Sequence, residues 1–409
     1  MTGWVPDVLP GYWQCTIPLG PDPDREGDIV ATLIRRGAAE AAHAVLAVHG
    51  YTDYFFHTEL ADHFADRGFT FYALDLRKCG RSRQLGQTPH FITNMSHYDV
   101  ELEHALSVIG TQARPVKVLV YGHSTGGLIV SLWLDKLRRR GATARAGVGG
   151  LVLNSPWLDL QGPAVLRLGV TSAAITALSR LRAKGVVRGQ GNGGYGHSLH
   201  RDYDGEFDYN LQWKPLGGFP ITFGWLNAMR RGQERLHRGL DVGVPNLILR
   251  SDHSVRESSG PTALQRGDAV LDVAQIARWA GCIGNRSTVV PVADAKHDVF
   301  LSLPQPRQIA YHQLDLWLDE YLKLWDNPDA SDDRKRGEAG RSGSSPSNPD
   351  DRKRGEAGRS GSSPSNPDDR KRGEAGRSGS SPSNPDDRKR GEAGRSGSSP
   401  SISASSGKG

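Results

Sequence analysis

The sequence predicts an α/β fold in which helices cover both faces of a mostly parallel sheet. Short β-branched or apolar runs alternate with longer stretches of helical periodicity through most of the chain. Strands that are buried on both faces have near-continuous apolar sequences, which matches the composition of these short runs. The 409 residues also suffice for one large domain, or two small ones, with a substantial hydrophobic core.

The predicted elements keep this alternation from the first strands to the last helix. An antiparallel pair of strands is expected at 13–17 and 28–35, ahead of the parallel strands. Further strands are expected at 43–49, 70–76, 116–121, 150–154, 244–250 and 287–292, and helices at 58–67, 97–109, 125–139, 272–280 and 306–324. The stretch 158–240 is too long for a crossover, and both of its flanks return to the sheet. It is therefore predicted to form a helical cap, with helices over 164–181 and 221–240.

Residues 331–409 differ in kind from the rest of the chain. The 18-residue unit DRKRGEAGRSGSSPSNPD is repeated three times from Asp333 and a fourth, truncated time. Ile402 is the only large apolar residue in this segment, which therefore cannot bury enough surface to offset its ordering entropy. We expect a disordered tandem-repeat tail behind a folded body of residues 1–330.

Charge and cysteine content exclude several classes of function. The tail holds 17 Lys+Arg and 12 Asp+Glu, so only +1 of the net charge of +6 belongs to the folded body. A nearly neutral body gives no indication of a nucleic-acid partner. Cys15, Cys79 and Cys282 lack the spacing of a metal site, and no metal ion is expected. Reduced thiols, the missing signal-peptide pattern and the lack of an 18-residue apolar run predict a cytoplasmic protein without stable membrane insertion.

The strongest chemical motif is GHSTGG, which spans Gly122 to Gly127. It fits the pattern G-x-S-x-G, follows the predicted strand VKVLVY directly and opens a predicted helix. That context is the one a nucleophile elbow requires, because the sharp turn lifts the serine hydroxyl clear of the sheet. The helix behind the turn adds partial positive charge where an alkoxide forms. We therefore predict that Ser124 is a catalytic nucleophile.

A second turn, beginning His49-Gly50-Tyr51, follows the predicted strand HAVLAVH. A His-Gly turn at this point supplies backbone N–H groups near a nucleophile elbow. The predicted oxyanion hole consists of the N–H of Thr125, directly after the serine, and the N–H of Tyr51.

The general base and its acid are expected late in the chain. Of the 14 histidines, His297 has the best placement, between the last strand and the last helix. The acid should follow the strand at 244–250, where Asp252 comes immediately and Asp268 comes after a polar loop. Asp268 is preferred, Asp252 is the alternative, and Asp272 is a third candidate. His123, inside the elbow, is expected to pack or to contact substrate.

With these residues in place, the chain resembles the serine aminopeptidase S33-like branch of the α/β-hydrolases, which includes monoacylglycerol lipases and lysophospholipases. The resemblance depends on HGYTDY at 49–54, ALDLRKCGRS at 73–82, YGHSTGG at 121–127 and KHDVF at 296–300. It implies an α/β-hydrolase fold and a small-molecule substrate, a glycerol ester or a lysophospholipid, cleaved through an acyl-enzyme on Ser124. It also implies that the enzyme uses no metal ion and no organic cofactor.

One departure from the family concerns the acid, which usually stands in a compact Gly-x-x-Asp-x-Val pattern after the strand. Here Ser251-Asp252-His253-Ser254 replaces the compact version, while Asp268-Ala269-Val270 recovers the Asp-x-Val portion. The resemblance thus predicts a loop insertion ahead of the acid, and both Asp252 and Asp268 stay open.

Four segments and three functional alternatives complete the prediction. The segments are the first half of the core at 1–157, the cap at 158–240, the second half of the core at 241–330 and the tail at 331–409. An aminopeptidase would need an acidic group for the substrate amine, and the cap offers Asp202, Asp204, Glu206 and Asp208. A non-catalytic ligand-binding member of the fold is the second alternative, and a tail that tethers the protein to an anionic surface is the third. The oligomeric state stays open.

Overall fold

The computed structural model describes residues 3–39, 41–112, 117–161, 169–188 and 191–326. Contacts divide the chain into Met1–Ser344 and Ser345–Gly409, and all described residues lie in the first unit. The predicted tail, 331–409, and the first residues of the helix predicted at 164–181 lie outside the described residues.

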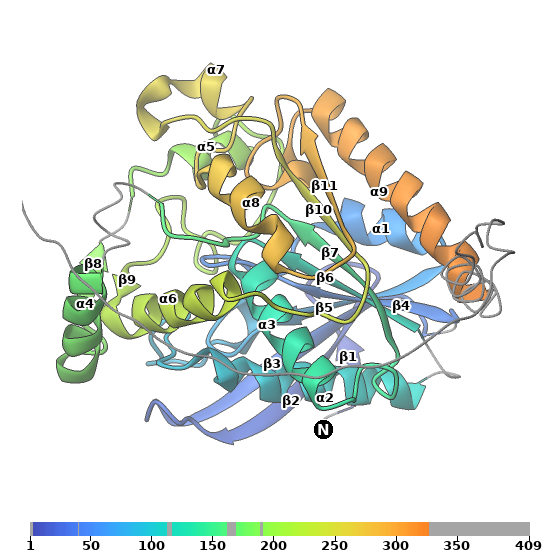
Figure 1. Ribbon diagram of the computed structural model, residues 1–409, viewed down its shortest axis with the longest axis horizontal. Coiled ribbons are helices and arrows are strands. Elements are labelled where there is room, and N and C mark those ends of the chain that lie inside the picture. Colours follow the sequence, from blue (N-terminus) through green and yellow to red (C-terminus); the bar gives the residue numbers. More distant parts are fainter. Residues whose placement is uncertain (1–2, 40, 113–116, 162–168, 189–190, 327–409) are drawn as a thin grey trace, which may run out of the picture. The chain divides into compact units, whose positions relative to one another are not determined.

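A nine-stranded sheet forms the centre of the first unit, in the order β1-β2-β3-β5-β4-β6-β7-β10-β11 (Figure 1). Its strands are β1 Val5–Pro6, β2 Tyr12–Pro21, β3 Asp28–Arg36, β4 His43–Val48, β5 Phe69–Asp75, β6 Lys117–His123, β7 Val148–Asn154, β10 Asn246–Ser251 and β11 Ser287–Val292. Pairing is antiparallel from β1 to β5 and parallel from β5 to β11. The predicted α/β class is confirmed, and the predicted antiparallel pair is β2 with β3, although the short β1 lies outside β2.

Two hydrophobic cores lie on opposite faces of this sheet because side chains alternate along each strand. In β4, Val45 belongs to one core, and its neighbour Leu46 belongs to the other. The helices that cover the faces are α1 Thr58–Asp66, α2 Tyr98–Gln112, α3 Thr125–Arg139, α8 Val273–Trp279 and α9 Pro304–Asp326 (Figure 1). Helices α1 and α9 contribute to the Val45 core, whereas α2, α3 and α8 contribute to the Leu46 core. Such double coverage explains why the strands have near-continuous apolar sequences.

The segment between β7 and β10, called the insertion below, has its own small elements. They are α4 Gly169–Leu181, β8 Val186–Arg188, α5 Gly194–Leu199, β9 Ile221–Thr222 and α6 Phe223–His237. Helix α6 packs into the core through Trp225 and Met229. The helix predicted from 221 begins two residues later, because Ile221 and Thr222 pair with β8 and the Thr222 hydroxyl then accepts the N–H of Trp225 as an N-cap.

Among the described residues, no helix combines the length and the apolar character needed to cross a bilayer.

Candidate active site

Ser124 occupies a strained turn between β6 and α3. Its φ of 53° and ψ of −118° lie outside the regions that side-chain-bearing residues usually adopt. The glycines on either side make the turn possible. A Cβ on Gly122 would lie 2.8 Å from the Cα of Gly127, and a Cβ on Gly126 would lie 2.5 Å from the carbonyl oxygen of His49. The motif therefore forms the elbow expected from its spacing, at the carboxyl end of a central strand.

Backbone hydrogen bonds hold this elbow against the end of β7. The Ser124 N–H donates to the carbonyl oxygen of Asn154 at 3.0 Å, and the Ser124 carbonyl accepts the N–H of Trp157 at 3.0 Å. Thr125 is the first residue of α3, so its N–H has no acceptor within the helix and is available to an oxyanion.

The turn after β4 lies directly beside the serine. A Cβ added to Gly50 would lie 2.9 Å from the Cβ of Ser124, so only glycine lets the two backbones approach this closely. The following Tyr51 is anchored to the insertion, since its hydroxyl donates to the carbonyl oxygen of Pro220 at 2.8 Å and its ring centroid lies 4.0 Å from that of Trp225. The structure thus brings the Tyr51 turn and the first turn of α3 to Ser124.

His297 and Asp268 form a buried pair. The His297 Nδ1 lies 3.0 Å from the Asp268 Oδ2, and the two side chains are 3% and 0% exposed. The other carboxylate oxygen of Asp268 accepts the backbone N–H groups of Val270 at 2.8 Å and Leu271 at 2.7 Å. These two bonds fix the carboxylate, and the carboxylate in turn orients the imidazole through its Nδ1.

Neither of the other two candidate acids contacts His297 among the described contacts. Asp252 is 40% exposed and pairs with His253 at 2.7 Å. Asp272 caps α8 by accepting the N–H of Ala274 at 3.0 Å. The loop after β10 returns to its starting point because the N–H of Asp268 donates to the carbonyl oxygen of His253 and the carbonyl of Asp268 accepts the N–H of Val255. This return explains how Asp268, 16 positions beyond Asp252, still reaches the end of the sheet.

The acidic residues of the insertion lie at the surface and are partly engaged in ion pairs. Asp208 pairs with Arg201 at 3.1 Å, and Glu206 pairs with Arg307 at 2.8 Å. Both carboxylates are about half exposed or more, so the surface is their main environment.

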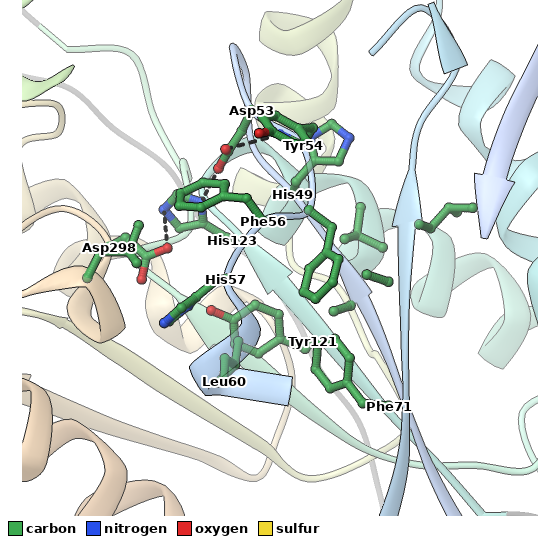
Figure 2. A pocket seen from close by; sticks show the side chains of 16 residues that line it. His49, Asp53, Tyr54, Phe56, His57, Leu60, Phe71, Tyr121, His123 and Asp298 are labelled. Carbon is green, nitrogen blue, oxygen red and sulfur yellow. Dashed lines mark hydrogen bonds and ion pairs between the residues drawn. The ribbon is translucent and has the colours of Figure 1, made fainter. Parts of the chain in front are cut away.

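A second buried polar group, which the sequence did not indicate, surrounds His123 (Figure 2). The His123 Nδ1 lies 3.4 Å from Asp53, and its Nε2 lies 3.8 Å from Asp298. Lys214 pairs with the other oxygen of Asp53 at 2.8 Å. The group borders a cavity of about 50 Å³, and His57 lines the same cavity. Because burial lowers the pKa of His57 to about 4, this ring is neutral at pH 7.

No cluster of three or more His, Cys, Asp or Glu side chains among the residues that the structure describes is arranged to hold a metal ion. Cys15, Cys79 and Cys282 form no disulfide bond among the residues that the structure describes.

Comparison with known families identifies one match. The sequence model described as serine aminopeptidase, S33, matches residues 39–258, which is more than half of the chain. The match includes Tyr51, Ser124 and Asp252 and ends before Asp268 and His297. No curated protein matches the chain in sequence.

Solved structures share the fold at low sequence identity. A soluble variant of monoglyceride lipase from Saccharomyces cerevisiae, in complex with a substrate analogue, superposes with a TM-score of 0.52 at 16% identity, covering 78% of this chain and 99% of the lipase. DcsB, in complex with its substrate analogue, gives a TM-score of 0.50 at 14% identity, covering 75% and 99% of the two chains. At these identities the comparison establishes the α/β-hydrolase fold.

Proposed function

Because this chain belongs to the serine aminopeptidase S33 family of hydrolases, we propose that it hydrolyses a carboxylic ester through an acyl-enzyme on Ser124. The observation that carries the proposal is the buried contact of 3.0 Å between His297 and Asp268. The His297 ring lies 5.0 Å from that of His123, the residue directly before the serine, so the pair lies next to the elbow.

The proposed reaction follows from the position of each group. His297 accepts the proton of Ser124 as the oxygen attacks the ester carbonyl, and Asp268 stabilises the imidazolium that forms. The N–H groups of Tyr51 and Thr125 bind the developing oxyanion. Loss of either donor is expected to lower the rate by roughly 10²–10³-fold. The imidazolium then protonates the leaving alcohol. Water activated by the same histidine releases the acid and restores Ser124.

A lipid-like ester, such as a monoacylglycerol or a lysophospholipid, is the proposed substrate class. Three aromatic side chains form a cluster that begins at the Tyr51 turn. The ring of Trp225 lies 4.0 Å from Tyr51 and is stacked on Trp157 at 5.6 Å, and the Trp157 backbone is bonded to Ser124. Such an apolar wall suits an acyl chain. The surface position of the insertion's acids gives the aminopeptidase alternative little support, because a substrate amine needs a carboxylate inside the site.

The test is hydrolysis of p-nitrophenyl esters from acetate to palmitate by the full chain and by Ser124→Ala. We expect activity that is lost in the variant, with an optimum at medium or long acyl chains. Equal activity in both proteins would remove Ser124 from the mechanism. No turnover by either protein, together with no fluorophosphonate labelling of Ser124, would favour a ligand-binding role.

A further inference from the structure

The His123 ring lies between three elements of the proposed site, and each of its nitrogens is within 4 Å of a carboxylate and has no hydrogen-bond partner among the described residues. It directly precedes Ser124, and its ring lies between two carboxylates, Asp53 at 3.4 Å and Asp298 at 3.8 Å (Figure 2). Asp53 follows the Tyr51 turn by two residues, and Asp298 directly follows His297. Three segments therefore meet at the His123 ring. They are the elbow, the turn that contains Tyr51 (the oxyanion turn) and the loop that contains His297 (the loop of the base).

Further contacts hold both carboxylates in place. Asp53 accepts from Lys214 of the insertion at 2.8 Å, and Asp298 accepts from the side-chain amide of Asn154 at 2.6 Å. Asp298 also caps the short helical turn after it by accepting the N–H of Phe300 at 3.0 Å. His123 and both acids are less than 10% exposed, so the group is shielded from water.

The charges of this buried group balance only if His123 is protonated. Asp53 and Asp298 supply two negative charges, and Lys214 supplies one positive charge. An uncompensated buried charge is costly, and an imidazolium would remove it. Burial opposes ionisation of Asp53, but Lys214 and then His123 more than offset this effect and keep the pKa of that carboxyl below its usual value.

The other groups around His123 cannot supply the missing charge. Both nitrogens of His49 contact backbone atoms, since its Nε2 accepts the N–H of Leu76 at 3.1 Å while its Nδ1 faces the carbonyl oxygen of Gly50 at 2.8 Å. Burial keeps His57 neutral at pH 7 and raises the pKa of Tyr121 and Tyr195 well above 10, so that these hydroxyls stay protonated. His297, whose ring centroid lies 5.0 Å from that of His123, must be neutral to act as a base.

We propose that His123 is a positively charged positioning residue, which links the oxyanion turn to the loop of the base and offsets the charge of Asp298 beside His297. The inference rests on the proposed function. His297 has one carboxylate, Asp268, in direct contact and a second, Asp298, next to it in the chain. Both favour an imidazolium, which could not accept the serine proton. A positive ring 5.0 Å away counteracts them and keeps the base ready for proton transfer.

The charge can be measured without turnover. In the full chain labelled with ¹⁵N-histidine, the ring signals of His123 are assigned by their loss in His123→Gln and are then followed from pH 5 to 9. We expect both ring nitrogens to remain protonated at pH 7.5. A neutral ring at pH 7 would overturn the proposal whether or not the protein hydrolyses esters, whereas loss of the proposed function alone would appear as absent Ser124-dependent turnover.

The positioning role is tested by the pH dependence of kcat/KM for p-nitrophenyl ester hydrolysis. Removing a positive neighbour in His123→Gln should move the acidic limb of the profile to higher pH, and removing a negative neighbour in Asp298→Asn should move it to lower pH. Each shift should be on the order of 0.5–1 pH unit, as for a unit charge about 5 Å away in a partly hydrated medium. In His123→Gln, kcat should fall about 10-fold or more while KM changes little.

His63→Gln is the matched control, because His63 forms an ordinary His–Asp pair with Asp315 at 2.9 Å between α1 and α9. Its profile should coincide with that of the unmodified protein. Coincident acidic limbs in all four proteins, or shifts of the same sign in His123→Gln and Asp298→Asn, would reduce His123 to a packing residue. If His123→Gln fails to fold, His123→Asn replaces it in both experiments.

Discussion

The nucleophile elbow, 122–127, and the acid loop, 252–271, present their side chains at the same edge of the sheet, but different forces fix them. In the elbow, a Cβ added to Gly126 would lie 2.5 Å from backbone carbonyl oxygens, which leaves room for glycine alone at this position. In the acid loop, two backbone N–H groups bind one oxygen of Asp268, and His297 contacts the other. The steric restriction in the elbow follows from the local sequence. The position of Asp268, in contrast, depends on contacts that form only when the loop folds back. The elbow is consequently recognisable as a motif, and the acid is not.

The largest expected effect comes from Ser124→Gly, which separates the strain of the elbow from its chemistry. The rate of ester hydrolysis should fall by at least about 10⁴-fold, because the nucleophile is absent. The free energy of unfolding should rise by about 1 kcal/mol, because glycine adopts a φ of 53° without strain. Hydrolysis and urea unfolding measure the two quantities. A less stable variant would show that the surrounding contacts, not a strained backbone, define the elbow.

Asp268→Asn, in the acid loop, should have the next largest effect on the rate. Asparagine can still accept the N–H groups of Val270 and Leu271, but it cannot stabilise an imidazolium at His297. We expect kcat to fall by roughly 10³–10⁴-fold with little change in KM. The matched variant Asp252→Asn, which alters the exposed pair with His253, should stay within about threefold of the unmodified protein. A larger loss in Asp252→Asn than in Asp268→Asn would reverse the assignment of the acid.

The same contrast explains what the sequence can and cannot predict. Helix α3 begins and ends at the residues that its periodicity predicts, because its apolar spacing reflects burial against the sheet. Strand β11 also has the predicted bounds, although most of its side chains are not buried. Ser124 is recognisable from the glycines around it. From the sequence, Asp268 is only the preferred candidate over Asp252. The backbone hydrogen bonds that close the loop between them cannot be recognised from its composition.

The buried polar group around His123 is harder to predict from the sequence than Asp268. Asp53 and Lys214 are 161 residues apart, and no local pattern relates them. His123 itself occupies a variable position of the motif G-x-S-x-G, so the motif gives no reason to expect a charge there. Long-range pairs of this kind follow from the way the insertion is seated on the sheet.

The steric restriction in the elbow can be tested with Gly126→Ala by measuring stability alone. The added Cβ would lie 2.5 Å from the carbonyl oxygens of both Val48 and His49, so backbone must move. We expect unfolding to become easier by about 1–3 kcal/mol. The control Gly110→Ala, in α2 with nothing within 4 Å of the new Cβ, should raise stability by about 0.5–1 kcal/mol. Equal effects of the two substitutions would mean that the elbow tolerates side chains.

The smallest expected effect concerns the loop of the base, where Lys296 is buried and donates to the carbonyl oxygen of Ser198 in α5 at 2.6 Å. Burial lowers the pKa of Lys296 from 10.5 to about 8. Above pH 8 the folded protein has therefore lost a proton that the unfolded chain keeps, so this residue makes the folded state more stable as the pH rises towards 10.5. Relative to Lys296→Met, the unmodified protein should gain about 1 kcal/mol of unfolding free energy between pH 8 and 9. A difference that stays flat or shrinks over this range would show that the ammonium group is well solvated, and that the insertion is held to the base loop by other contacts.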